Sequence, residues 1–298
     1  MIDYLYLGLY RIFGGLLRIM PRSGVIIMMR LLARFAHAIS PKHRRTIATN
    51  LEIAFPHQLS ANEKKKIGIG AFTNLLDTTL GIIERDGMAK EEVIQNVTFE
   101  GEAILQAYRD AGKKVILITG HQGNWELLSQ AIAIKFDLTL VGVGRKLDSD
   151  LMDKILKANR ERFNVEMVYK KGAMKGCIKA LNQNKVVGIL VDQSIRLSQS
   201  ITVQFFGKPA THTPLASILS RKFGVDLIPA FISTNDYIHY HITIHDPIKT
   251  IKTNDHEEDL KRLTQAQADV MEQVIREHPN EWFWMHKRWK RLNEGLYE

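Results

Sequence analysis

The segment VILITGHQGNWELLSQ, residues 115–130, joins a run of apolar residues to a helical pattern across a short turn. The run is aliphatic and β-branched up to Thr119, which is typical of a strand buried on both faces. Gly120 ends the run, and helical spacing of apolar residues begins near Asn124. A strand that leads directly into a helix is the repeating unit of an α/β fold.

Short apolar runs alternate with helical stretches over much of the remaining chain. The further runs are LTLVGVG (138–144), VEMVYK (165–170), KVVGILV (185–191) and VDLIPAFI (225–232). This alternation predicts an α/β fold with a mostly parallel, mixed sheet that helices cover on both faces. DYIHYHITIHD (236–246) alternates strictly between polar and apolar residues, which predicts an antiparallel edge strand. A last helix is expected at about residues 255–278.

The first 90 residues read as helical and hold most of the chain's excess positive charge. Of the formal net charge of +9, residues 1–45 carry +7, from eight basic residues and one acidic residue. The arginines are interspersed with apolar residues, a pattern typical of segments attracted to anionic lipid headgroups. We therefore predict amphipathic membrane-associated helices in residues 1–36 and a separate domain in residues 37–298. Amphipathic core helices with solvated arginines are the alternative.

Composition and spacing argue against several other classes of protein. The 253 residues after residue 45 carry only about +2, so nucleic acid is not an expected partner. No uncharged apolar run reaches the roughly 18–20 residues that span a bilayer. The single cysteine, Cys177, excludes an intramolecular disulfide and is expected to be a small helix residue. The HExxH spacing is missing, so no metal site is expected.

His121 and Glu126 are the candidate catalytic pair. They lie five positions apart, so they can meet only if His121 sits in the turn and Glu126 in the first turns of the helix. A carboxylate that accepts the Nδ1 proton would leave Nε2 as a general base. The alternative is a strand-end histidine that caps the helix, with Glu126 as an ordinary acid of the first turn.

Further candidate site residues follow other predicted strands or line their ends. Asp192 and Gln193 follow the strand at 185–191 and face the same rim of the sheet as His121. Arg145 follows another strand, where it would meet a phosphate or an oxyanion. Phe205 and Phe206 are candidates for the wall of an apolar channel. The tail HPNEWFWMHKRWKR (278–291) is either an interfacial aromatic-basic patch or a set of core tryptophans.

Taken in order, the motifs resemble those of the late acyltransferases of lipid A biosynthesis, a group that includes lauroyl and myristoyl transferases. They are RRTIATNLEIAFP (44–56), GHQGNWE (120–126), VDQS (191–194), FFGKPA (205–210) and PNEWFWMHKRWK (279–290). The resemblance runs nearly end to end. Two positions depart from the family's pattern, Lys146 after Arg145 and Pro214 after Thr213.

The resemblance implies a membrane-bound enzyme with residues 37–298 as its acyltransferase domain. It would transfer an acyl chain from acyl carrier protein to the 3-hydroxyl of an acyl chain on a lipid A precursor, without cofactor or acyl-enzyme. The reaction would take place on the cytoplasmic side of the bacterial inner membrane. His121 would be the base and Glu126 its partner, with the Gly123 and Asn124 N–H groups, or Arg145, stabilising the oxyanion.

Two alternatives stay open from the sequence. The acceptor of an acyltransferase of this kind is either a lipid A precursor or another glycolipid or phospholipid. A non-enzymatic basic peripheral protein that binds anionic lipid also fits the charge distribution.

Overall fold

A computed structural model of the chain describes residues 2–297. Its strands are β1 (Val97–Glu100), β2 (Ile116–Thr119), β3 (Leu140–Gly144), β4 (Val165–Tyr169), β5 (Val186–Leu190), β6 (Ile201–Phe205), β7 (Lys208–His212), β8 (Leu227–Ser233) and β9 (Tyr240–Ile244). Its helices are α1 (Ile2–Ile19), α2 (Arg22–Ile39), α3 (Pro41–Ala54), α4 (Ala61–Glu84), α5 (Lys90–Ile94), α6 (Glu102–Asp110), α7 (Trp125–Lys135), α8 (Asp150–Glu161), α9 (Ala173–Asn182), α10 (Leu215–Phe223) and α11 (His256–Glu277), with short 3₁₀ turns at Leu197–Gln199 and Pro279–Glu281.

Seven strands form one mixed sheet in the order β1-β9-β8-β2-β5-β3-β4. Every pair is parallel except β8 with β9, so the predicted α/β fold is confirmed. The five predicted apolar runs all form strands of this sheet. β9 is antiparallel to β8 as predicted, but it is not an edge strand because β1 pairs with its other side. β1 has only four residues, too few for its alternation to stand out from the sequence.

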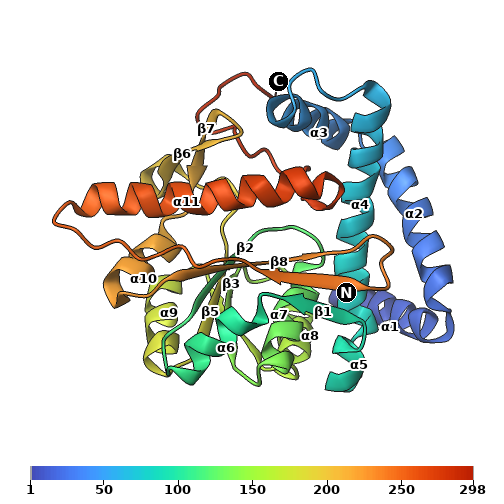
Figure 1. Cartoon of the computed structure of the whole chain (residues 1–298). Coiled ribbons are helices and arrows are strands. Elements are labelled where there is room, and N and C mark those ends of the chain that lie inside the picture. Colours follow the sequence, from blue (N-terminus) through green and yellow to red (C-terminus); the bar gives the residue numbers. More distant parts are fainter. Residues whose placement is uncertain (1, 298) are drawn as a thin grey trace.

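The two faces of the sheet are covered by different helices. Ile116, Ile118 and Ile189 pack with α9 and α10 on one face. Leu117 and Ala230 point to the other face and pack with α7. Figure 1 shows α11 along one side of the sheet and α6, α7 and α8 on the other. Cavities on the two faces are therefore separated by the sheet itself and meet only at its edges.

The helices at the N-terminus pack along one side of the molecule against α4 (Figure 1). Ser60 and Glu63 form a capping box at the start of α4. α1 ends at Ile19, just before Pro21. Within the described residues, no single helix is long and apolar enough to cross a bilayer, whereas α2 and α3 pass that test only together, with a 94° bend between them.

The C-terminal tryptophans belong to the core. Trp282, Trp284 and Trp289 are fully buried, which decides against an interfacial patch. Phe205 and Phe206 pack on these rings at the turn of the β6–β7 hairpin, with Phe205 5.9 Å from Trp282 between ring centroids. The prediction that the two phenylalanines wall the active-site channel is therefore wrong. They are buried because the antiparallel hairpin, which the sequence pattern did not indicate, folds them onto α11 and the tail.

Candidate active site

His121 lies just beyond the carboxyl end of β2, in the middle of the sheet. Two glycines allow the turn that carries it. A Cβ on Gly120 would lie 2.4 Å from the Met271 Cε and 3.2 Å from the Asp192 Cγ, so no other residue fits there without displacement. Gly123 has φ +57°, and a Cβ there would lie 2.0 Å from the Ile232 carbonyl oxygen. The predicted position of His121 at the strand end is confirmed.

Asp192 is the carboxylate that contacts His121. It follows β5, the strand next to β2, and its Oδ1 lies 2.7 Å from the His121 Nδ1. Its Oδ2 accepts the His121 backbone N–H at 2.9 Å and the Trp282 indole N–H at 2.8 Å. A carboxylate at Nδ1 keeps the proton on that nitrogen and leaves Nε2 with a free lone pair. The arrangement leaves one imidazole nitrogen, Nε2, available as a base.

The charge of Asp192 is maintained although the side chain is buried. Burial alone would raise the pKa of this carboxyl, but the charge and hydrogen bonds of His121, together with the Trp282 indole, hold the pKa well below its usual range. Asp192 is thus ionised at neutral pH. An ionised partner favours the imidazolium that forms when Nε2 takes a proton.

The His121 imidazole is held in place on its remaining sides by three side chains. The Trp125 ring lies 5.0 Å away and the Phe283 ring 6.1 Å away, both measured between centroids. The Gln193 side-chain amide nitrogen lies 3.2 Å from Nε2, where it donates to the lone pair. Gln193 therefore marks the position that a substrate hydroxyl has to occupy.

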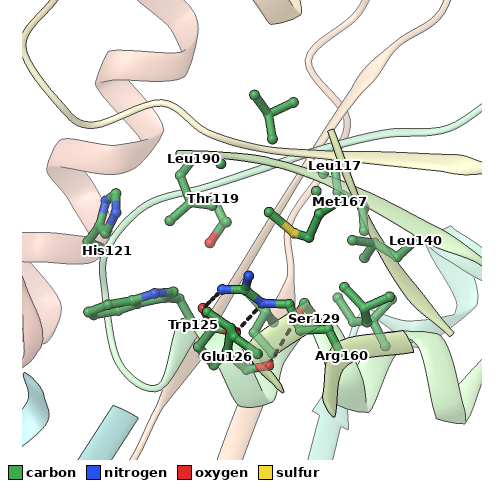
Figure 2. A pocket seen from close by; sticks show the side chains of 18 of the residues that line it. Leu117, Thr119, His121, Trp125, Glu126, Ser129, Leu140, Arg160, Met167 and Leu190 are labelled. Atoms are coloured by element: carbon green, nitrogen blue, oxygen red, sulfur yellow. Dashed lines mark hydrogen bonds and ion pairs between the residues drawn. The ribbon is translucent and has the colours of Figure 1, made fainter. Parts of the chain in front are cut away.

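Glu126 does not contact His121 through the bond that the sequence predicted. Its carboxylate instead forms a two-pronged ion pair with Arg160 at the end of α8, with the Arg160 Nε 2.9 Å from the Glu126 Oε2. In Figure 2 Glu126 points toward Arg160, and His121 stands apart from that pair. The reason is geometric, because α7 begins at Trp125 and directs the next side chain toward α8.

The C-terminal segment supports the turn that carries His121. The Phe283 N–H donates to the His121 carbonyl at 3.0 Å, and the Gly123 N–H donates to the Glu281 carbonyl at 3.2 Å. Because this N–H is already bonded, the predicted use of Gly123 as an oxyanion donor is not supported by the geometry. Sequence reasoning missed Trp282 and Glu281, although both lie in the motif PNEWFWMHKRWK.

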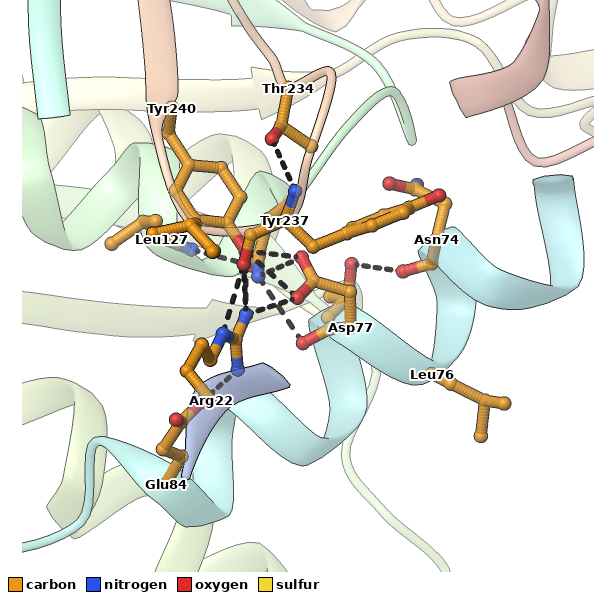
Figure 3. Close-up of polar contacts among 12 residues, drawn as sticks. Arg22, Asn74, Leu76, Asp77, Glu84, Leu127, Thr234, Tyr237 and Tyr240 are labelled. Carbon is orange, nitrogen blue, oxygen red and sulfur yellow. Dashed lines mark hydrogen bonds and ion pairs between the residues drawn. The ribbon is translucent and has the colours of Figure 1, made fainter. Parts of the chain in front are cut away.

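Asn124 links the same turn to a buried ion cluster, shown in Figure 3. Its side chain caps α7 by accepting the Leu127 N–H and donates to the Asp77 carboxylate at 2.8 Å. Asp77 also accepts from the Tyr240 hydroxyl at 2.8 Å and from Arg22, the first residue of α2, at 2.9 Å. The Asn124 side chain therefore has a structural role, which ties α2 to the active-site turn, while the use of its backbone N–H as an oxyanion donor stays a prediction.

A first cavity, the α7–α8 cavity, lies between the sheet and these two helices and has a volume of about 240 Å³ (Figure 2). His121, Glu126 and Arg160 lie in its wall. The rest of the lining is mostly apolar and includes Leu117, Leu128, Ile132, Leu140, Leu156, Val165, Met167, Leu190 and Ala230. Such a lining suits a single hydrocarbon chain.

A second cavity, the α9–α10 cavity, lies on the opposite face of the sheet and has a volume of about 800 Å³. Its lining includes Val143, Met174, Ile189, Ile195, Pro214, Leu215 and Ile218, with Lys170, Gln193 and Thr213 among the polar side chains. Both cavities reach His121 and Arg145 at the carboxyl edge of the sheet. Arg145 is exposed there and pairs with Asp148 at 2.7 Å.

Two further sequence predictions concern other chemistry. Cys177 is fully buried in α9, and burial raises the pKa of its thiol to about 11, which agrees with a structural role for this residue. Among residues 2–297, no three His, Cys, Asp or Glu side chains gather in a group that would hold a metal ion.

Glu281 makes the stability of this site dependent on pH. Burial, with a smaller contribution from the charge of Asp77, raises the pKa of its carboxyl to about 8. The folded state then binds one more proton than the unfolded chain between pH about 4.5 and 8, so stability falls as pH rises through that window. One pKa unit corresponds to about 1.4 kcal/mol, so the free energy of unfolding should fall by several kcal/mol as the pH rises through this window.

We expect Glu281→Gln to remove this loss, because the amide does not ionise. In thermal unfolding from pH 5 to pH 9, the melting temperature of the variant should rise relative to the unmodified chain by several degrees. Glu294→Gln, at an exposed position, is the matched control and should show no such trend. A constant difference between Glu281→Gln and the unmodified chain across the pH range would contradict the assignment.

Comparison with known proteins finds relatives along nearly the whole chain. The model of the family described as bacterial lipid A biosynthesis acyltransferase matches residues 1–291. The lipid A biosynthesis lauroyltransferase of Escherichia coli (strain K12) is 27% identical over 272 residues, covering 89% of this chain and 85% of the relative. A lipid A biosynthesis acyltransferase of Haemophilus influenzae is 21% identical over 261 residues, covering 86% and 79% respectively. A lipid A biosynthesis palmitoleoyltransferase of Escherichia coli (strain K12) is 24% identical over 256 residues, covering 84% and 79% respectively.

Proposed function

The chain belongs to the bacterial lipid A biosynthesis acyltransferase family, and on this premise we propose that it transfers an acyl group from acyl carrier protein to a hydroxyl of a lipid A precursor. The observation that carries the proposal is a buried, ionised Asp192 bonded to a His121 whose free Nε2 lies at the mouth of an apolar cavity. The direct transfer needs no cofactor and no acyl-enzyme.

The reaction follows from the atoms around Nε2. Nε2 removes the proton of the acceptor hydroxyl, and the oxygen attacks the thioester carbonyl carbon to give a tetrahedral oxyanion. Collapse of this intermediate breaks the carbon–sulfur bond and forms the ester, and the imidazolium returns its proton to the leaving thiolate. Asp192 stabilises the imidazolium throughout. We assign stabilisation of the developing oxyanion to the Gln193 amide, a side-chain donor that lies 3.2 Å from Nε2.

The α7–α8 cavity supplies a place for the donor acyl chain. Its lining is apolar away from His121, and its mouth opens at the imidazole, so a chain inside it would present its thioester carbonyl there. The Glu126–Arg160 pair lies in the wall near the mouth. We assign these two residues to the shape and polarity of the cavity entrance, and we assign the role of histidine partner to Asp192.

Exposed apolar faces on α1 and α2 support attachment to the cytoplasmic face of the inner membrane. On α1 the exposed residues Leu5, Leu9, Ile12, Leu16 and Ile19 recur at helical spacing, and on α2 so do Ile27, Leu31, Phe35 and Ile39. Ile12 is 68% exposed and Phe35 63%. Arg11, Arg18, Arg30 and Arg34 lie among them, which suits anionic headgroups. Residues 1–36 would then bring the domain of residues 37–298 to its lipid acceptor.

The proposal is tested by acyl transfer to acceptor embedded in phosphatidylglycerol vesicles. Purified protein, radiolabelled acyl-acyl carrier protein and a lipid A precursor should yield a labelled precursor with one additional ester-linked chain, identified by mass spectrometry. Label that enters phospholipid instead of the precursor would favour the alternative acceptor class. If no labelled lipid of any kind forms, the protein is not an acyltransferase that uses this donor.

The same assay tests the membrane face. Ile12→Asp/Phe35→Asp should lower transfer in vesicles at least tenfold, because two carboxylates oppose insertion of the apolar faces, while transfer in detergent micelles is retained. Asn182→Asp/Asn254→Asp adds the same charge at exposed positions outside α1 and α2 and serves as the control. Equal loss of transfer in vesicles and micelles would contradict a role of this face in membrane attachment.

A further inference from the structure

The α9–α10 cavity is not explained by the donor chain. It lies on the face of the sheet opposite the α7–α8 cavity, because Ile189 lines only this cavity whereas its neighbour Gly188 lines only the other cavity. A linear chain in one cavity cannot reach the other without rounding the carboxyl edge of the sheet. The enzyme thus has one apolar cavity on each face of the sheet, and the two meet at its carboxyl edge, where they share His121, Val143, Gly144, Arg145 and Leu190.

We propose that the α9–α10 cavity binds a fatty acyl chain of the acceptor, so that the two substrates reach His121 from opposite faces of the sheet. This inference rests on the proposed function and adds to it the location of the second substrate. It requires an acceptor that carries acyl chains, and it places the reacting hydroxyl on or beside a chain held in this cavity.

The position of the His121 Nε2 supports the acceptor chain in the α9–α10 cavity and the donor chain in the α7–α8 cavity, and argues against the reverse arrangement. Gln193, whose amide lies 3.2 Å from Nε2, lines the α9–α10 cavity and is not part of the lining of the α7–α8 cavity. The base therefore faces the second cavity. Since the base removes a proton from the acceptor hydroxyl and none from the thioester, the acceptor belongs on that side.

Size and charge point the same way. The α9–α10 cavity has about 800 Å³ against about 240 Å³ for the other, as expected if it holds part of a branched, multi-chain lipid. Lys170 lines only the α9–α10 cavity, Arg145 lies where the two cavities meet, and both are exposed, where they complement the anionic headgroup of a phosphorylated lipid. The smaller α7–α8 cavity, with its mostly apolar lining, is matched to one acyl chain.

The test fills each cavity separately from a half-buried aliphatic residue on a lining helix. Ile218→Trp on α10 narrows the α9–α10 cavity, and Leu156→Trp on α8 is its matched counterpart in the α7–α8 cavity. Initial rates are measured in mixed micelles with a lipid A precursor and an acyl-acyl carrier protein of defined chain length, varying one substrate while the other saturates.

Ile218→Trp should raise the KM for the acceptor at least tenfold and shift preference toward acceptors with shorter chains. Its KM for the donor should change less than twofold. Leu156→Trp should do the opposite, shifting donor preference toward shorter acyl groups. Reversed effects, or effects of both variants on the donor alone, would overturn the proposal.

Two further measurements separate failure of this proposal from misfolding of a variant and from failure of the proposed function. If either tryptophan variant fails to fold by circular dichroism, Ile218→Ala and Leu156→Ala enlarge the same cavities and should shift the respective chain preferences toward longer chains. Absence of shift in both alanine variants would also overturn the assignment. Lack of transfer by the unmodified chain would instead refute the proposed function, so the two failures are distinguished.

Discussion

Asp192→Asn should lower kcat by about 10³–10⁴-fold, to nearly the level of His121→Ala, without unfolding the protein. The reason lies in the three donors around the carboxylate. The His121 backbone N–H and the Trp282 indole N–H both donate to Oδ2, so this atom must remain an oxygen in the asparagine variant. The amide nitrogen of asparagine is therefore forced to the Oδ1 position, facing Nδ1. It would donate to Nδ1, move the imidazole proton to Nε2 and abolish the base.

Glu126→Gln provides the contrasting experiment, because its carboxylate pairs with Arg160. This change leaves the Nδ1 contact intact, so kcat should fall much less than in Asp192→Asn. It leaves Arg160 unpaired in the cavity wall, and Glu126→Gln/Arg160→Gln should recover part of the lost activity. Arg160→Gln should not rescue Asp192→Asn. Near-normal kcat for Asp192→Asn, or a loss of kcat in Glu126→Gln as large as the one expected for Asp192→Asn, would restore Glu126 as the histidine partner.

The sequence predicted the position of the proposed base, His121, better than it predicted the carboxylate that contacts it. A histidine at the end of a continuous apolar run could be placed at the active edge of an α/β sheet, since that edge is defined by strand direction alone. Its partner depends on which strands are neighbours. Asp192 meets His121 because β5 pairs with β2, although the chain passes through β3 and β4 between them. Strand order is a long-range property that local spacing does not contain.

The same limitation explains the wrong interpretation of Phe205 and Phe206. Two aromatic residues before a glycine suit either a channel wall or a hairpin turn, and the choice depends on the tail. Trp289 donates its indole N–H to the Phe205 carbonyl at 3.1 Å, across more than eighty residues of sequence. The tryptophans of the tail were ambiguous from sequence for the same reason. Amphipathic helices such as α4 and α11 were predictable because their signal is local.

Arg22→Met should reduce the free energy of unfolding by about 3 kcal/mol, although Arg22 lies at the start of a helix assigned to the membrane-associated region. Its guanidinium pairs with Asp77, whose side chain is fully buried, and with Glu84 at 2.6 Å. Removing the arginine leaves Asp77 buried beside fewer compensating charges. This loss of stability is at the low end of the range for breaking a buried ion pair, because the buried Arg85 still compensates part of the Asp77 charge.

A double-mutant cycle separates this effect from the general loss of a side chain. Asp77→Asn combined with Arg22→Met should be more stable than Arg22→Met alone, because the uncompensated charge is removed. Arg34→Met, on an exposed position of the same helix, is the control and should change the free energy of unfolding by less than about 0.5 kcal/mol. The free energy of unfolding of the two single variants, the double variant and Arg34→Met is measured by urea unfolding of the full chain at a constant detergent concentration. If the effects of Arg22→Met and Asp77→Asn on the free energy of unfolding are additive, the ion pair does not join α2 to α4, α7 and the active-site turn. In that case α2 is held by its apolar contacts alone.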